Sequence, residues 1–439
     1  MRPNTRATAS PRILLAAVLA VAVMASGCAQ GASDADAFEG IWQSEGFGLI
    51  LDVSGGIDVY EYTPVSCGLV AGGSERGSGE ILGIAGDRLI LAEADRTISF
   101  DRIEALPLAC SERYYTEDPT ASFEVLVATM EEHYAFFDLR QPDWPERAEA
   151  AASAVTVDLD DAGLLRAMQD LLGPLGDAQV RISGPGRDLL PEGAWSAGAA
   201  SPEVVALAER IRSGRVPGLD EVEITGDRAV VSGLLSGPSG DIGYLAINRL
   251  AGFDADPTAE ERTLADALFE QLGRFGGAGA LIIDLRVNRG GRESLAMLTA
   301  SRFVSEDTPV ATRLVRAGGT SSYVDGGDVV VRPLPSGPYP ARIAVLVGPG
   351  TSGAGELLAL ALREVPGAVL VGAPTSGSLS PLLVRTLPNG WTLGLSNQQV
   401  IDSDGVLWEG AGIPPDVEVT EPATDDRDPV IEAALAALG

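Results

Sequence analysis

A turn near residue 352 has the residue types and the position that a nucleophilic catalyst needs. The apolar run 342–347 (RIAVLV) predicts a buried strand, and a helix is expected over residues 353–365, so Ser352 lies where that helix starts. The first turn of a helix has unpaired N–H groups that favour a developing negative charge. Ser352 could therefore act as a nucleophile. A serine here is more often an N-cap, whose hydroxyl accepts a hydrogen bond from the helix, and we favour that interpretation.

A second turn could stabilise the oxyanion that such a reaction forms. Residues 288–291 (NRGG) follow the apolar run 280–285 and end in Gly290 and Gly291. Two successive glycines let the backbone turn its N–H groups outward with no β-carbon in the way. The turn suits an oxyanion hole, but taken alone it is more typical of a tight strand-to-helix connection.

A serine nucleophile also needs a base, and the sequence offers few candidates. All 31 basic residues are arginine, no lysine occurs, and the single histidine is His133. Histidine is the side chain that ordinarily titrates near neutral pH. Because His133 lies beside three aromatic residues in a predicted helix, a packed structural role is the expectation for it. A role as catalytic base is the alternative.

The segment that carries both turns predicts an α/β core. Over residues 241–420, apolar strands alternate with helices of ten or more residues, a pattern typical of buried parallel strands covered by helices. Residues 421–439 are expected to form a C-terminal helix or tail. The predicted strands are 243–247, 280–285 and 342–347, and the predicted helices are 259–275, 293–303 and 353–365.

Three other blocks precede this core. Alternating apolar residues and glycine turns over residues 39–115 predict a small antiparallel β-domain. Residues 116–185 carry a helical period over 121–137, 144–155 and 162–172, and predict a helical segment. Residues 186–240 form a connecting α/β region with one helix, 202–213, and two short strands, 222–225 and 229–234.

Four patches of the core, taken in order, resemble the tail-specific or C-terminal processing serine peptidases. That resemblance implies a core with the ClpP/crotonase-like α/β fold. Two upstream patches, 132–138 (EHYAFFD) and 175–179 (LGDAQ), are similar to the tricorn-type branch of the family. The four core patches are 284–291 (DLRVNRGG), 350–356 (GTSGAGE), 372–377 (GAPTSG) and 404–416 (DGVLWEGAGIPPD).

The resemblance also shows which catalytic side chains are missing. The position of the family's nucleophilic serine is Gly353 in this chain, one residue after Ser352. The tricorn-type branch places its histidine base where this chain has Gln179, and an amide cannot take up a proton near neutral pH. Glu409 matches the glutamate that supports that histidine. In the other branch the base is a lysine, which this chain lacks, and its position is Ser378.

These substitutions predict a pseudopeptidase that binds extended peptides or protein C-termini without cleaving them efficiently. The resemblance implies Gly290 and Gly291 as the remnant of its oxyanion hole. One alternative is an active endopeptidase in which Ser352 attacks with help from His133. The other is a purely structural surface lipoprotein, for which the β-domain is the main support.

The first residues predict export and lipid anchoring. Residues 1–27 have a basic start, a short apolar run and small residues directly before Cys28, which resembles the lipobox of a bacterial lipoprotein. Lipidation of Cys28 would hold the mature protein outside the cytoplasm on a membrane, through a linker at residues 28–38. An ordinary cleaved signal is the alternative. Cys67 and Cys110 would then face an oxidising compartment and form either a disulfide or two buried free thiols.

The composition narrows the class of partner. The formal net charge is -31, which disfavours binding to the phosphates of nucleic acid. With one histidine and two cysteines expected to pair, ligands for a transition-metal site are lacking, and we expect no metal and no cofactor. An unstructured polypeptide is the expected partner.

Overall fold

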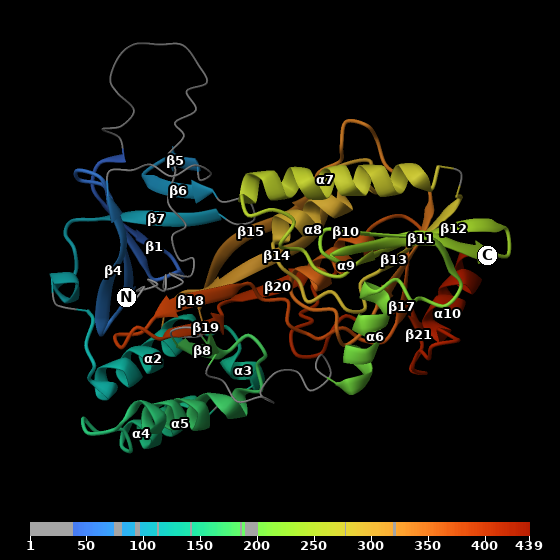
Figure 1. The fold of residues 1–439 in the computed structure, drawn as a ribbon. Coiled ribbons are helices and arrows are strands. Elements are labelled where there is room, and N and C mark those ends of the chain that lie inside the picture. Colours follow the sequence, from blue (N-terminus) through green and yellow to red (C-terminus); the bar gives the residue numbers. More distant parts are fainter. Residues whose placement is uncertain are drawn as a thin grey trace, which may run out of the picture.

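The computed structural model describes residues 38–439 except 74–80, 93–96, 112–113, 141–142, 185–186, 189–200, 277 and 319–321. The predicted signal segment and Cys28 lie outside the described residues. Figure 1 shows an N-terminal β-domain at one end, helices below it, and a layered α/β core at the other end. No helix within the described ranges is long and apolar enough to cross a membrane.

The N-terminal domain is one antiparallel sheet, in which the described strands have the order β4-β3-β2-β1-β7-β6-β5. Its buried face carries Trp42 and Phe100, which belong to the same hydrophobic cluster as Phe123 and Leu126 of the following helix. The β-domain is therefore packed on the rest of the chain. The strands are β1 (Ile41–Ser44), β2 (Leu49–Asp52), β3 (Ile57–Thr63), β4 (Ser66–Gly73), β5 (Ile81–Ala85), β6 (Arg88–Ala92) and β7 (Thr97–Ile103).

A disulfide and a group of helices connect this domain to the core. Cys67 in β4 and Cys110 are joined by a disulfide with a Cα–Cα distance of 4.5 Å. The next helix starts where the Asp118 carboxylate accepts a hydrogen bond from Thr120 N at 2.9 Å, a standard N-cap. The helices are α2 (Pro119–His133), α3 (Phe137–Arg140), α4 (Trp144–Ala152) and α5 (Asp161–Leu172).

The core is a sheet covered by helices on both faces, with the strand order β10-β11-β12-β13-β16-β17-β21 over the described residues. Its strands from β12 to β21 are parallel, and β10 and β11 are antiparallel at one edge. Leu281 and Ile283 of β13 face α7, α8 and α9, whereas Ile282 faces α6 and α10. Figure 1 shows α7 and α8 above the sheet and α6 and α10 below it. Successive side chains of a strand point to opposite faces of the sheet, so β13 contributes to the hydrophobic layer on each face.

The elements of this core have the following bounds. The strands are β10 (Leu219–Thr225), β11 (Val230–Gly237), β12 (Gly240–Ile247), β13 (Ala280–Asp284), β16 (Arg342–Val347), β17 (Val369–Gly372) and β21 (Val417–Glu418). The helices are α6 (Pro202–Arg212), α7 (Pro257–Arg274), α8 (Glu293–Ala300), α9 (Ala354–Arg363) and α10 (Pro429–Leu438).

Two smaller sheets complete the structure, and one of them joins distant parts of the sequence. Strand β8, which follows the helical segment, pairs with β19 near the C-terminus, so Ile182 lies opposite Leu393. This pairing brings residues near 180 to the core. The two sheets are β15-β14-β20 and β18-β19-β8-β9, built from β8 (Arg181–Gly184), β9 (Arg187–Asp188), β14 (Thr308–Arg316), β15 (Tyr323–Val331), β18 (Leu382–Thr386), β19 (Thr392–Ser396) and β20 (Gln398–Asp402).

Candidate active site

The two turns singled out by the sequence lie side by side. Strands β13 and β16 are parallel neighbours, so the turns that follow them leave the same edge of the sheet. Ser352 N donates to Asn288 O at 2.9 Å. A β-carbon on Gly350 would lie 2.5 Å from Arg286 O, so only glycine permits this close approach of the two backbones. The strand order has therefore assembled a single site from residues 285–291 and 348–354.

A buried charge network supports the first turn. The Arg286 guanidinium donates to the Asp284 carboxylate at 2.7 Å and to Asp428 at 2.9 Å, and all three side chains are buried. Asp428 is also the N-cap of α10. Asp284 accepts a further hydrogen bond from Tyr244 Oη at 2.7 Å. These residues connect the C-terminal helix to the start of the turn that ends in Gly290 and Gly291.

Gly353 is the residue that the sequence resemblance predicted at the family's nucleophile position. Gly353 is the N-cap of α9 and has φ 57° and ψ -126°, a strained conformation for any residue with a side chain. A β-carbon built there would have Gly290 Cα at 3.9 Å and Ser378 O at 4.0 Å as its nearest neighbours. The site thus has space for a side chain at residue 353, and no side chain fills it.

Ser352 does not have the role that the sequence favoured for it. The N-cap of α9 is Gly353 and not Ser352, which precedes the cap, so that expectation is wrong. The cap is completed by Glu356, whose carboxylate accepts from Gly353 N at 3.1 Å. Ser352 is held through its backbone, and its Oγ has no hydrogen-bond partner among the described residues. Its hydroxyl therefore has no base in contact with it.

The backbone donors of the site are only partly available. Gly290 N donates to Asn288 Oδ1 at 2.8 Å, so this amide already has an acceptor. Gly291 N and Ala354 N have no acceptor within the described part of the chain. Ala354 N would lie only 2.9 Å from a β-carbon at Gly290, which places it beside the glycine turn. We infer that Gly291 and Ala354 can hold an oxyanion or a carbonyl; sequence reasoning missed Ala354.

Gln179 reaches the site from the other end of the sequence. Its Nε2 donates to Ser380 O at 2.9 Å and to Ser378 O at 3.3 Å. Gly353 N also donates to Ser378 O, at 3.1 Å. Gln179 and Gly353 therefore share one acceptor. The position predicted for the base is therefore close to Gly353, the position predicted for the nucleophile, but it holds an amide that donates and takes up no proton.

Glu409 lies in the same region in a buried polar cluster. Its Oε2 accepts from Leu379 N at 2.9 Å and from Ser380 N at 3.1 Å, whereas its Oε1 has no hydrogen-bond partner in the described structure. Arg140 lies 3.7 Å from Glu409 and 3.8 Å from Asp177. Burial, and then the nearby Asp177 charge, raise the pKa of Glu409 to about 8.

We expect the stability of the protein to fall with rising pH because of Glu409. The folded pKa of about 8 lies above the ordinary value of 4.5, so the folded state keeps a proton that the unfolded chain loses between these pH values. The stabilisation of the folded protein by protonated Glu409 is full below pH 4.5 and is lost as the pH rises through 8. From pH 5 to 8.5 the free energy of unfolding should fall by roughly 2–4 kcal/mol more in wild type than in Glu409→Gln. Urea unfolding of wild type and Glu409→Gln across this pH range tests the prediction. If the free energy of unfolding changes equally with pH in the two proteins, the prediction is wrong.

A second buried glutamate holds the loop opposite Gly353. Glu356 is fully buried, and besides the Gly353 amide it accepts from Gly377 N at 2.7 Å, from Ser378 N at 2.9 Å and from the Thr375 hydroxyl. Burial raises its pKa to about 7, and the hydrogen bonds oppose that shift. Its spacing, three residues after the N-cap, was the signal in the sequence that could have identified it.

His133 lies apart from these residues. It is 3% exposed at the end of α2, where a β-carbon on Gly48 of the β-domain would come within 2.5 Å of its Nε2. Burial is the main cause that lowers the pKa of His133 to about 3, and the charge of Arg385 is the second cause. The Gly46 backbone opposes this shift only in part. This weakly basic side chain packs against the β-domain. It has no described contact with Ser352, which fits the structural role expected from the sequence.

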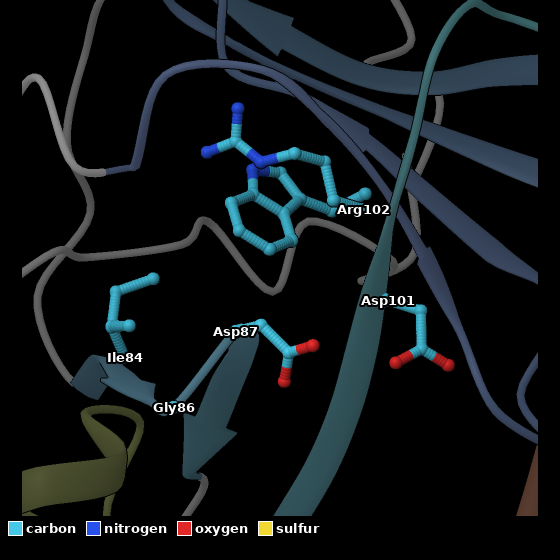
Figure 2. Close-up of a pocket in the computed structure, with 6 residues that line it drawn as sticks. Ile84, Gly86, Asp87, Asp101 and Arg102 are labelled. Atoms are coloured by element: carbon cyan, nitrogen blue, oxygen red, sulfur yellow. The ribbon is translucent and has the colours of Figure 1, made fainter.

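Two pockets in the described part of the chain contain none of these residues. One lies in the β-domain, has a volume of about 350 Å³, and is lined by Trp42, Ile84, Gly86, Asp87, Asp101 and Arg102; Figure 2 shows its lining side chains. A second pocket, of about 370 Å³, lies along α2. Among the residues that the structure describes, no group of three histidine, cysteine, aspartate or glutamate side chains could hold a metal ion.

The core and its two turns define a chain with the architecture of a serine peptidase. Residues 241–419 match the model of peptidase family S41. The sequence of this core is thus similar to peptidase family S41, as the resemblance of its motifs predicted. A carboxyl-terminal-processing protease of Synechocystis sp. is 31% identical over 204 residues, which cover 46% of this chain and 41% of that protein. The chain thus spans less than half the length of this relative.

Two solved structures share the fold over most of their length. One is a candidate peptidase of Parabacteroides merdae, with a TM-score of 0.61 and 21% identity over 74% of this chain and 97% of the other. The other is mature CPAF, with a TM-score of 0.52 and 12% identity over 71% of this chain and 93% of the other. These likenesses confirm the predicted fold class, an α/β peptidase core preceded by helices and an antiparallel β-domain.

Proposed function

We propose that this protein is an exported member of the tail-specific peptidase family that binds extended polypeptides or protein C-termini and cleaves them poorly or not at all. The observation that carries this proposal is Gly353. Its backbone has the geometry and the open space of a nucleophile position, yet it has no oxygen with which to attack.

The size of the expected loss favours binding over catalysis. Removing the nucleophile or the base of a serine-peptidase triad costs about 10⁴- to 10⁶-fold in turnover. This corresponds to roughly 5–8 kcal/mol of activation free energy. Gln179 donates to two carbonyl oxygens and cannot serve as the base, and Ser352 Oγ has no partner in the described structure that could activate it.

The groups that remain are suited to holding a polypeptide backbone. The amides of Gly291 and Ala354 are directed by a glycine turn and by the start of α9, and neither has an acceptor within the described ranges. Backbone N–H groups of this kind hold a substrate carbonyl in a peptidase, and they can equally hold the carbonyl of a peptide that is not cleaved.

One experiment separates binding from catalysis. The full-length chain and Ser352→Ala, both purified in detergent, are treated with a fluorophosphonate probe and with a fluorescent unstructured polypeptide. We expect neither protein to be labelled or to cleave, and both to bind the polypeptide with similar affinity by fluorescence anisotropy. Labelling or cleavage that wild type shows and Ser352→Ala lacks would establish an active Ser352 peptidase. A complete lack of binding would also overturn the proposal.

We further propose that the protein is attached to a bacterial membrane, outside the cytoplasm, through lipid on Cys28. The support is the sequence of residues 1–28 alone. Fractionation of cells that express wild type or Cys28→Ala tests the anchor. Wild type should stay with the membranes and the variant should be released; a variant retained as fully as wild type would contradict the proposal.

A further inference from the structure

Basic side chains gather at one side of the candidate site, although the chain as a whole has twice as many acidic as basic residues, 62 against 31. Arg289 directly precedes the glycine pair of the first turn and is exposed. Arg249 is the second residue after β12, and Arg212 is the last residue of α6. These three arginines come from separate parts of the chain.

The backbone places Arg249 beside Arg289. Leu250 N donates to Gly290 O at 2.8 Å, and Arg292 N donates to Leu250 O at 2.7 Å. Leu250 and Gly291 therefore form a parallel bridge. Arg249 directly precedes Leu250, and Arg289 directly precedes Gly290. Because these two segments are hydrogen-bonded to each other, both arginine side chains start from the same edge of the site.

The partners of Arg249 hold its side chain in place without cancelling its charge. Its guanidinium donates to Gly226 O and Asp227 O, each at 3.0 Å, and to Ala251 O at 2.9 Å. These acceptors are neutral carbonyls. The Asp227 carboxylate lies 3.6 Å away but its side chain is 93% exposed, so the ion pair is strongly screened by water. Arg249 is a fixed cation.

The end of helix α6 lies near Arg249. Glu209, three residues before Arg212, is 3.9 Å from Arg228, and Asp227, the residue before Arg228, accepts a hydrogen bond from Arg249. The start of the helix contacts the second turn of the site, because the Val204 side chain would lie 3.0 Å from a β-carbon on Gly350. At its other end Glu209 is shared by Arg215 at 4.0 Å and Arg228 at 3.9 Å, and its side chain is 59% exposed. Partial burial, and then repulsion from Arg289 and Arg249, lower the pKa of Arg212.

We propose that Arg212, Arg249 and Arg289 form an anion subsite at the edge of the candidate active site, and that this subsite takes a carboxylate of the bound polypeptide. The inference rests on the proposed function and names the chemistry that the site selects. Guanidinium groups match a carboxylate in shape and charge, and a two-point contact fixes its orientation. The carboxylate comes either from the C-terminus of the polypeptide or from an aspartate or glutamate side chain near it.

Three versions of one fluorescent unstructured peptide test this inference. The first has acidic residues near a free C-terminal carboxylate, the second has the same sequence with a C-terminal amide, and the third has the acidic residues replaced by amides. Their Kd values are measured by anisotropy for wild type, for Arg212→Gln/Arg289→Gln and for Arg262→Gln. Arg262 is an exposed residue of α7, and its substitution controls for a change of charge elsewhere on the surface.

We expect the double variant to bind the first peptide at least about tenfold more weakly than wild type does, because charged hydrogen bonds of this kind are lost. Arg262→Gln should bind it as wild type does. Weaker binding of the second peptide by wild type identifies the C-terminal carboxylate as the ligand, and weaker binding of the third identifies an acidic side chain. Equal affinity of wild type for all three peptides, or an unchanged double variant, would overturn the subsite alone. If wild type binds no peptide, the subsite falls together with the proposed function.

Discussion

Gly353→Ser combined with Gln179→His is expected to turn this protein into a measurable serine hydrolase. A β-carbon at residue 353 would be 4.0 Å from Ser378 O, the atom to which Gln179 Nε2 donates at 3.3 Å, so a new hydroxyl and a new imidazole would lie within reach of each other. A positioned general base contributes about 10²- to 10⁴-fold. The double variant should therefore cleave an unstructured polypeptide at least about 100-fold faster than Gly353→Ser alone.

The control for this prediction is Gly353→Ala combined with Gln179→His. It carries the same histidine and a β-carbon at the same backbone position, where a positive φ costs roughly 1–2 kcal/mol for any residue but glycine, yet it has no hydroxyl. Fluorophosphonate labelling and hydrolysis should appear only with the serine. If both double variants are folded and equally inert, the two positions are not in catalytic register and the interpretation of Gly353 is wrong.

Glu356→Ala is expected to lower the free energy of unfolding by at least about 4 kcal/mol. The carboxylate accepts hydrogen bonds from three backbone amides and the Thr375 hydroxyl in a fully buried position. Gly353 N keeps Ser378 O as a second acceptor, so the substitution leaves the other three donors without Glu356. Each buried donor left without an acceptor costs about 1–3 kcal/mol. Glu356→Gln keeps one acceptor oxygen but turns an NH₂ group towards these donors, so its cost should be lower but still substantial. Urea unfolding measures both variants.

Glu270→Ala is a suitable comparison, because Glu270 is exposed on α7. This substitution should change stability by less than about 0.5 kcal/mol. A loss below about 1 kcal/mol for Glu356→Ala would mean that water or a shifted loop satisfies the three donors, which the buried position of the carboxylate argues against.

Both predictions follow from our proposal that the supporting structure of a peptidase site is kept while its reactive atoms are absent. Glu356 still holds the loop that contains Ser378, and Glu409 still accepts from the two residues that follow it. Interactions of this kind fix backbone amides, and the same amides can bind a peptide whether or not it is cleaved. A family member can therefore lose turnover without losing the polypeptide as ligand.

The sequence by itself predicted that a nucleophile and a base are absent. Within residues 241–420 it also predicted the strands β12, β13 and β16 and the helices α7, α8 and α9, but not the other strands of that segment. The absence of lysine and the identities of Gly353 and Gln179 need no coordinates, and the alternation of apolar strands with helices predicted the core. In the β-domain, the alternating pattern predicted strands over 46–53, 57–62, 80–84 and 88–92, which correspond to β2, β3, β5 and β6, but it omitted β1, β4 and β7. These strands are short, glycine-rich or charged at one end, so local periodicity hardly marks them.

Only the tertiary structure decided which groups meet. The contact of Gln179 with Ser380 spans 201 residues and depends on the pairing of β8 with β19. The structure also showed that Gly290 N is already occupied, that Ala354 N is available, and that His133 packs against the β-domain. The physical reason is that a side chain's chemistry is local to its residue, whereas its neighbours and burial are set by strand pairing between segments far apart in the chain.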